Sequence, residues 1–256
     1  MRKLFLDLER APTLGYFYDR YGVNISPTAI VDNGFIVSVQ WAYDDEPVQS
    51  LSLRHIKKPL KSKDDKPLVV KAIELMDKAD VVIAHNAIKF DLAVIAARCA
   101  VHGIKPPPPI NVVDTLKACR RFFKFEANSL NAVCQELGLG KKFSSGGMDT
   151  MLACMKCDQE AWDTMLEYGE HDVTLLRDLY YKIRPFIKDH PNHNLTEPTL
   201  RSVCKNCGSH NMQARGVART LTMEYHRYQC KDCGAWNRER KNCLDKDKKD
   251  SILTGC

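Results

Sequence analysis

Four acidic residues in three separate stretches of the chain have the types and spacing that could hold divalent metal ions. Asp7 and Glu9 lie two residues apart in the largely apolar run 3–9, and side chains at i and i+2 share one face of a strand. Two carboxylates on such a strand repel each other and are costly to desolvate, and bound cations would relieve both penalties. For an isolated Asp-x-Glu, a strand end at which both acids reach water is the simpler interpretation.

The other two acids follow helical patterns. Asp91 comes after the apolar run 81–84 and begins a helical series of apolar residues, where it could be only a first-turn acid favoured by the helix dipole. Tyr168 and Asp172 lie four residues apart in a long helical stretch and therefore share one helix face. Alone, they could be a tyrosine packed on the core beside a solvated acid. The occurrence of all three stretches in this order favours one shared site.

In this order the stretches resemble the three motifs of the DEDD exonucleases, which have the ribonuclease-H-like fold. The matching residues are Asp7-x-Glu9, Asn86-x-x-x-Phe90-Asp91 and Tyr168-x-x-x-Asp172. The third motif is that of the tyrosine subtype, because the histidine subtype would need a histidine where Glu167 stands. Segment 129–140 is also similar to the connecting region of proofreading domains in family B DNA polymerases.

The resemblance implies a 3′–5′ exonuclease that hydrolyses phosphodiester bonds at single-stranded or frayed 3′ ends, with DNA favoured over RNA. It implies two Mg²⁺ or Mn²⁺ ions, which prefer carboxylate oxygens, held by Asp7, Glu9, Asp91 and Asp172. Tyr168 would hold the attacking water in line, since an ordinary pKa near ~10 makes it a poor base at neutral pH. The alternatives are a ribonuclease-H-like endonuclease or flap nuclease, and a non-catalytic nucleic-acid-binding adaptor.

Several neighbouring residues are weaker candidates for the site. Asn86, Lys89 and Phe90 could contact substrate, although solvated surface is the simpler role for Lys89 and a pocket wall for Phe90. Asp114 is most simply a cap between a strand and a helix, with a role behind the metal ligands as the alternative. The loop 141–147 lies near the substrate or is only surface.

The fold expected from these patterns is α/β, with a mixed central sheet flanked by helices. Strands are expected near 3–9, 28–32, 34–43, 48–54, 80–84 and 110–113, and helices near 67–78, 91–102 and over most of the stretch to 188. We expect a ribonuclease-H-like domain over 1–190, a linker at 191–198, a zinc ribbon over 199–241 and a charged tail over 242–256.

The C-terminal segment carries its own metal motif. Two Cys-x-x-Cys pairs, separated by 22 residues, offer the four thiolates of a tetrahedral structural Zn²⁺ site: Cys204, Cys207, Cys230 and Cys233. The 11 cysteines of a chain expected to be cytosolic indicate thiols and metal rather than disulfides.

Charge is concentrated in the same segment. From position 199 onward there are 12 Lys and Arg against 6 Asp and Glu, while the preceding residues carry 26 of each, so the whole net charge of +6 lies in the C-terminal part. Basic groups suit phosphates and aromatic faces suit unpaired bases. Arg227 and Trp236 are therefore candidates for contact with nucleic acid. The alternative is that the ribbon docks a replication or repair protein.

Composition sets the remaining expectations. No run of eighteen apolar residues could cross a membrane, and Asp7, Glu9 and Arg10 interrupt any signal-peptide core. We expect a cytoplasmic protein without a membrane partner, of a kind that would suit a bacterium or a bacterium infected by a virus.

Overall fold

The computed structural model describes residues 1–18, 21, 24–56, 64–142, 146–198 and 200–254. The chain divides into two compact units, one of Arg2–Leu179 and one of Tyr180–Cys256 with Met1. Within the described residues, no helix has the length and apolar content needed to span a bilayer.

A five-stranded mixed sheet with the order β5-β4-β1-β6-β7 forms the centre of the first unit. The central strand β1 pairs antiparallel with β4 and parallel with β6. Both faces of β4 are covered, since all eight of its residues are buried. The strands are β1 (Lys3–Arg10), β4 (Ile36–Tyr43), β5 (Gln49–Ser52), β6 (Val81–Ala84) and β7 (Asn111–Asp114).

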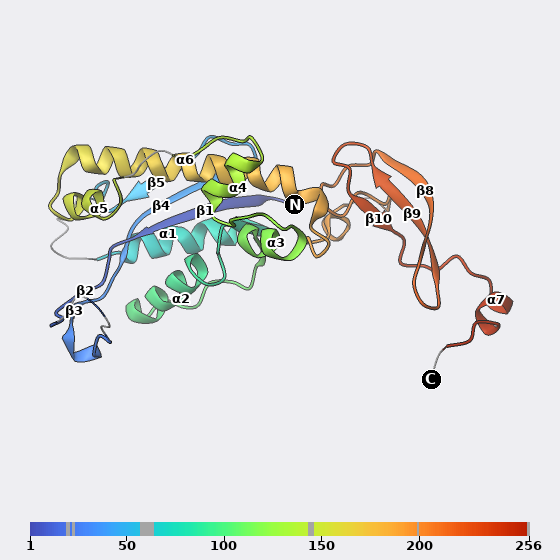
Figure 1. Ribbon diagram of the computed structural model, residues 1–256, viewed down its shortest axis with the longest axis horizontal. Helices are drawn as coiled ribbons and strands as arrows, with labels where there is room; N and C mark the ends of the chain where they lie inside the picture. Colours follow the sequence, from blue (N-terminus) through green and yellow to red (C-terminus); the bar gives the residue numbers. More distant parts are fainter. Residues whose placement is uncertain (19–20, 22–23, 57–63, 143–145, 199, 255–256) are drawn as a thin grey trace. The chain divides into compact units, whose positions relative to one another are not determined.

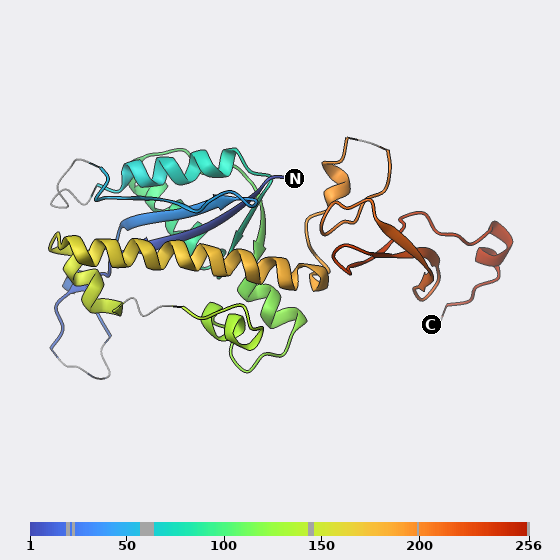
Figure 2. The same ribbon diagram turned by 90° about the horizontal axis from the view of Figure 1, so that it is seen from above.

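Helices lie on either side of this sheet. In both ribbon views the strands run between α6 and α1 (Figures 1 and 2). The helices are α1 (Lys66–Asp77), α2 (Asp91–His102), α3 (Thr115–Phe122), α4 (Leu130–Glu136), α5 (Gly147–Met155) and α6 (Gln159–Ile183). The expected fold class is confirmed, and the expected sheet strands and the helices near 67–78 and 91–102 match to within a few residues. The strand expected near 28–32 is β3 (Ile30–Asp32), which pairs with β2 (Leu14–Gly15) in a separate two-stranded sheet.

A buried ion pair fixes the helix that carries Asp91. Asp65, fully buried just before α1, accepts hydrogen bonds from Arg98 of α2 at 2.7 Å and from the backbone N–H of Ile36 at 2.8 Å. Burial alone would raise the pKa of Asp65, but the hydrogen bonds from Arg98, His102 and Ile36 outweigh it and hold the pKa below its usual range. This carboxylate therefore ties α2 to β4 and to the start of α1.

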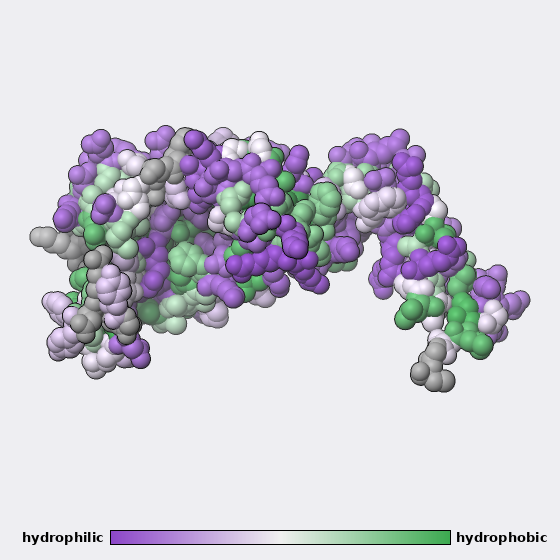
Figure 3. All heavy atoms as spheres, viewed as in Figure 1, coloured by the Kyte–Doolittle hydropathy of each residue, from purple (hydrophilic) through white to green (hydrophobic). Residues whose placement is uncertain are grey.

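The second unit is a small three-stranded antiparallel sheet with the order β10-β9-β8. Its elements are β8 (Met212–Arg219), β9 (Glu224–Cys230), β10 (Trp236–Arg238) and the short α7 (Lys246–Asp250). Figure 3 shows hydrophilic residues, with paler ones among them, over much of the visible face of these strands.

The end of α6, from Tyr180 onward, belongs to this second unit. Asn206 donates hydrogen bonds to the carbonyls of Arg184 and Ile187 at 2.7 and 3.1 Å, and Tyr180 donates to Nε2 of the buried His190 at 2.8 Å. The expected linker 191–198 lies within this unit. The division between the two units thus falls inside α6, earlier than position 190, because side-chain bonds join the helix end to the ribbon. The expected domain limits themselves stay predictions.

Candidate active site

The acidic residues of β1 face α6. Asp7 pairs with Gln40 of β4 and Glu9 pairs with Ser38, so these four side chains share one face of the sheet. A glycine in α6 allows the helix to come close to this face, because a Cβ atom at Gly169 would lie 2.7 Å from Cδ of Gln40. Gln40 is fully buried and donates to Ser38 Oγ at 2.9 Å, so it has little freedom to move aside. The neighbours of Gly169 are therefore brought beside the acids of β1.

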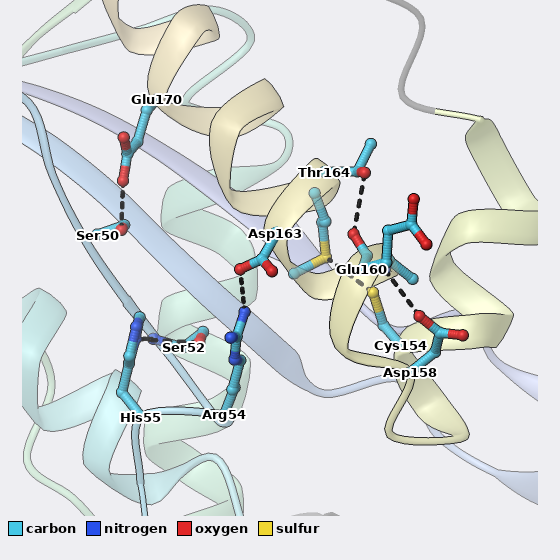
Figure 4. Close-up of polar contacts among 12 residues, drawn as sticks. Ser50, Ser52, Arg54, His55, Cys154, Asp158, Glu160, Asp163, Thr164 and Glu170 are labelled. Carbon is cyan, nitrogen blue, oxygen red and sulfur yellow. Dashed lines mark hydrogen bonds and ion pairs between the residues drawn. The ribbon is translucent and has the colours of Figure 1, made fainter.

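Polar contacts with the edge of the sheet hold α6 in this position. Glu170 accepts a hydrogen bond from Ser50 of β5 at 2.5 Å, and Asp163, further toward the start of α6, pairs with Arg54 (Figure 4). These two contacts lie two helical turns apart along α6 and thus fix its direction over the sheet. On the same stretch of helix, Asp172 is buried and Tyr168 lines a pocket.

The fourth acid is placed by a turn between β6 and α2. Asn86 takes a left-handed conformation there, with φ of 75°, which asparagine tolerates better than most residues. Asp114 accepts hydrogen bonds from the backbone N–H groups of Asn86 and Ile88 at 3.1 and 3.3 Å, and it also caps α3. The predicted capping role of Asp114 is confirmed. It fixes the turn after which α2 begins with the buried Asp91.

The electrostatics identify these acids as one cluster. Burial, followed by the charges of Asp91, Glu9 and Asp172, raises the pKa of Asp7 well above its ordinary value. Burial and then the charge of Asp172 raise the pKa of Glu9 to about 7. Burial likewise raises the pKa of Asp91 to about 7, against backbone hydrogen bonds from its own N–H and that of Leu8. Positive charge beside these acids would favour their ionised forms, as the charge of Lys142 already does for Asp7, Glu9 and Asp172.

Two of these carboxylates offer unused ligand atoms. Among the described residues, Asp91 Oδ1 and Asp172 Oδ1 are buried oxygens without a hydrogen-bond partner, and such oxygens are costly to leave unpaired. An all-oxygen donor set of this kind fits hard cations such as Mg²⁺ or Mn²⁺.

Comparisons with known proteins agree with this geometry. A family model described as the RNase H superfamily matches residues 32–184, which is more than half of the chain. The chain belongs to the RNase H superfamily. The matched range contains Asp91, Tyr168 and Asp172 and begins after the acids of β1. Membership supports nuclease function in general, a nucleic-acid substrate and the use of divalent metal ions.

A solved structure has a similar fold. It is the family B DNA polymerase from the hyperthermophilic archaeon Pyrobaculum calidifontis, with a TM-score of 0.54 and 16% sequence identity over 72% of this chain. The match spans 24% of that polymerase chain, and the likeness at this identity concerns the fold alone. No curated protein matches the sequence.

The structure adds one residue to the candidate site, namely Lys142. Its Nζ donates to Tyr168 Oη at 3.1 Å and pairs with Oδ2 of Asp172, while its backbone N–H is held by Asn131 at 2.9 Å. Burial raises the pKa of Tyr168, although the hydrogen bond from Lys142 lowers it. Because Lys142 donates to the hydroxyl oxygen, Tyr168 acts as a donor through its O–H, and its hydrogen bond to the Asp172 carboxylate lowers the pKa of that acid, although burial raises it overall. The expected loop 141–147 thus contributes a site residue at its start, and positions 143–145 lie outside the described residues.

A pocket of about 360 Å³ opens beside the acids. Glu9, Tyr168 and the half-exposed Phe90 line it together with residues of α5, and Phe90 has 38% of its surface exposed. Phe90 thus forms part of the wall. Lys89 is exposed outside the pocket lining and Asn86 is a turn residue, so their contact with substrate stays a prediction.

The four cysteines of the second unit form a separate cluster that could hold a metal ion. Their sulfur atoms lie within 4.8 Å of one another, with 3.6 Å between Cys204 and Cys233 and between Cys207 and Cys230. A tetrahedral Zn²⁺ with Zn–S bonds of about 2.3 Å needs sulfurs roughly 3.8 Å apart, so the donor set fits this ion. Asn237 also donates to Cys204 Sγ at 3.6 Å. The cluster is consistent with a zinc ribbon, and its four thiols leave no need for His210 or His226.

The contacts of Lys142 predict a coupled loss of activity. Lys142→Met should slow cleavage about 10- to 100-fold, because both Asp172 and the Tyr168 hydroxyl lose their orientation. Tyr168→Phe should slow it about tenfold. The double variant should lose less than the product of the two, since residues that act through one contact are not additive. Single-turnover rates would measure this cycle, with the exposed neighbour Lys141→Met as the matched control. Fully multiplicative losses would show that Lys142 does not act through Tyr168.

Proposed function

We propose that this protein is a metal-dependent 3′–5′ exonuclease that removes nucleotides from single-stranded or frayed ends, with DNA as the favoured substrate. The observation that carries the proposal is the pair of buried, unpartnered oxygens of Asp91 and Asp172 in one electrostatic cluster with Asp7 and Glu9. Membership of the RNase H superfamily, the pocket beside the cluster and the motif order of the DEDD exonucleases support it.

The chain's own groups have distinct roles in this proposal. Asp7, Glu9, Asp91 and Asp172 would hold two Mg²⁺ or Mn²⁺ ions. When bound, these ions would supply Lewis-acid stabilisation of the charge that develops on the scissile phosphate. Tyr168 keeps its proton at neutral pH because its pKa is raised by burial, so it orients the attacking water by hydrogen bonding and does not take a proton. Lys142 orients the Tyr168 hydroxyl and the Asp172 carboxylate.

The zinc ribbon would recruit substrate to this site. The acids and bases of the segment before position 199 cancel, whereas the ribbon segment carries the excess positive charge. A site built on four carboxylates attracts polyphosphate poorly until its cations are bound, and a basic module in the same chain would raise the local concentration of substrate.

End-labelled and circular substrates test the polarity and the need for an end. With Mg²⁺, a 3′-labelled single strand should release labelled mononucleotide at once, while a 5′-labelled strand should shorten through a ladder and a circular strand should stay intact. Cleavage of the circle would favour the endonuclease alternative, and no cleavage of any substrate would favour the adaptor. Running DNA and RNA strands side by side would decide the substrate class.

Proton and metal binding should compete at the acidic cluster. In the metal-free protein, Glu9 and Asp91 keep protons up to about pH 7 when folded, but carboxyls of the unfolded chain release them near pH ~4. The folded state binds more protons in this range, so the free energy of unfolding should fall as pH rises from 5 to 8. Added Mg²⁺ should therefore raise the melting temperature by a few degrees at pH 8 and by less at pH 6.

Thermal denaturation with and without Mg²⁺ would measure this effect. Asp91→Asn serves as the control, because it removes one titrating ligand and should flatten both the pH dependence and the response to Mg²⁺. A response to Mg²⁺ that is larger at pH 6 than at pH 8 would contradict the assignment of these carboxyls as ligands.

A further inference from the structure

One face of the ribbon carries two arginines at the same register position. β9 and β10 pair antiparallel with Arg227 directly opposite Arg238, so both side chains project from the same face. Like charges in such a position destabilise a strand pair. The neighbouring acid Glu224 is engaged by Arg219 at 2.5 Å. A bound anion between the two guanidinium groups would convert this repulsion into attraction.

An aromatic ring supports each of these arginines. The Cζ atom of Arg227 lies 4.7 Å from the ring centroid of Trp236, and that of Arg238 lies 4.1 Å from the ring of Tyr225. Each ring lies two residues from an arginine on its own strand, Tyr225 from Arg227 and Trp236 from Arg238, so the rings and the arginines project from the same face of the sheet. Arg227 is fixed further by donating Nε and Nη2 to the carbonyl of Arg215 at 3.1 and 2.9 Å. The guanidinium groups are thus preorganised, which reduces the entropy lost on binding.

Arg227, Arg238 and Trp236 also line a groove of about 920 Å³ along the edge strand β10. Six of its lining residues are basic and one is acidic, and that acid, Glu239, accepts a hydrogen bond from Tyr228 at 2.6 Å. The basic residues are Lys188, Lys205, Arg227, Arg238, Arg240 and Lys241. Trp236 has 52% of its surface exposed at the groove. A positively charged groove with an exposed ring matches the requirements of an unpaired strand, because a duplex hides the faces of its bases.

We propose that this face of the ribbon is a binding site for single-stranded nucleic acid. Arg227 and Arg238 bind successive backbone phosphates and Trp236 stacks on a base. The site would bind an internal stretch of a single strand and would not require a free 3′ end. Its use as a recruiting site rests on the proposed exonuclease function, whereas the binding itself does not.

Binding by a full-length Asp7→Asn protein tests the site without digestion of the probe. The probe is an internally labelled circular single-stranded DNA, which has no end for the active site to take. The joint change Arg227→Gln and Arg238→Gln should weaken binding about tenfold, and the slope of log affinity against log salt should fall by about 1.4, at about 0.7 for each phosphate lost. Trp236→Ala should weaken binding about tenfold with the slope unchanged.

The joint change Arg215→Gln and Lys231→Gln is the matched control, because it removes two positive charges from exposed side chains of the same ribbon outside the groove lining, and it should leave affinity nearly unchanged. Circular dichroism and a zinc content of one per chain would show that each variant is folded. Joint replacement of the two arginines with lysine should restore most of the salt slope, since charge is kept.

Three results would overturn the proposal. The first is unchanged affinity and salt slope in the Arg227 and Arg238 double variant. The second is a double variant that no longer binds poly-glutamate, which the parent protein binds, but still binds the circle. This result would indicate an acidic protein as the partner of this face. The third is a blunt duplex bound as tightly as the circle and insensitive to Trp236→Ala. The circle assay is independent of end-labelled cleavage, so failure of the exonuclease proposal would be seen separately.

Discussion

Asp91→Asn should reduce cleavage of a linear single strand by about a thousandfold while the protein stays folded. Asp91 is 2% exposed at the first position of α2, and its Oδ1 atom has no partner within the described chain. Asparagine has the same shape but lacks the negative charge that would hold a cation, and removal of one such electrostatic group typically costs 10²–10³ in rate. Single-turnover cleavage at saturating Mg²⁺ would measure the loss.

Stability supplies an independent readout for the same variant. Because burial and neighbouring acids raise the pKa of Asp91, replacement of its carboxylate should stabilise the metal-free protein at pH 8 and weaken its response to Mg²⁺. The exposed Asp77→Asn at the end of α1 is the matched control and should change neither property. Wild-type cleavage by Asp91→Asn would place the chemistry elsewhere in the molecule.

The sequence predicted the sheet and its acids because both depend on local periodicity. Asp7 and Glu9 share a face of β1 simply because a strand has a two-residue repeat, and Tyr168 and Asp172 share a face of α6 because they lie one turn apart. The pattern also placed Asp91 at the start of a helix after an apolar strand, as the structure has it, but it did not predict that this residue is buried. That these acids would hold metal ions remains a prediction.

Lys142 could not be predicted from its own neighbourhood. It lies in a polar, glycine-rich segment without periodicity, and its partners Tyr168 and Asp172 are 26 and 30 residues away. The contact depends on how a loop folds back over α6, which local propensity does not encode. The hydrogen bond from the backbone N–H of Lys142 to Asn131 likewise has no recognisable motif in a single sequence.

The grouping of segment 191–198 with the second unit also depends on contacts that are distant in sequence. The segment 191–198 is polar with two prolines, a composition typical of linkers. In the structure, Asn194 exchanges hydrogen bonds of 2.8 Å with the backbone of Val203, and Asn206 donates to the carbonyl of Arg184, just after the end of α6.

The pairing of the ribbon strands also could not be predicted from the sequence. Arg227 and Trp236 were identified by type, but the register that sets Arg227 against Arg238 is a tertiary property.

Cys207→Ser should abolish zinc binding and unfold the ribbon sheet. In the described part of the chain, the hydrophobic cluster around the four cysteines has three buried residues, Cys204, Cys230 and Ala235, with Met212 partly buried against them. So little apolar burial is too small to hold a sheet of this size without a further staple. Coordination by four thiolates in structural zinc sites is worth about 10–16 kcal/mol. Loss of one ligand should therefore remove most of the folding free energy of the strands β8 to β10, whereas the first unit keeps its own large core.

Zinc content and hydrogen exchange would measure this loss together. The wild-type protein should carry one zinc ion per chain and protect the backbone amides of β9, while Cys207→Ser should carry none and exchange these amides within the dead time. Cys243→Ser, which removes an exposed thiol from the same unit, should keep both the zinc and the protection. If Cys207→Ser kept protected strands without zinc, the ribbon would depend on its packing against the end of α6, through contacts such as those of Asn206, rather than on the metal.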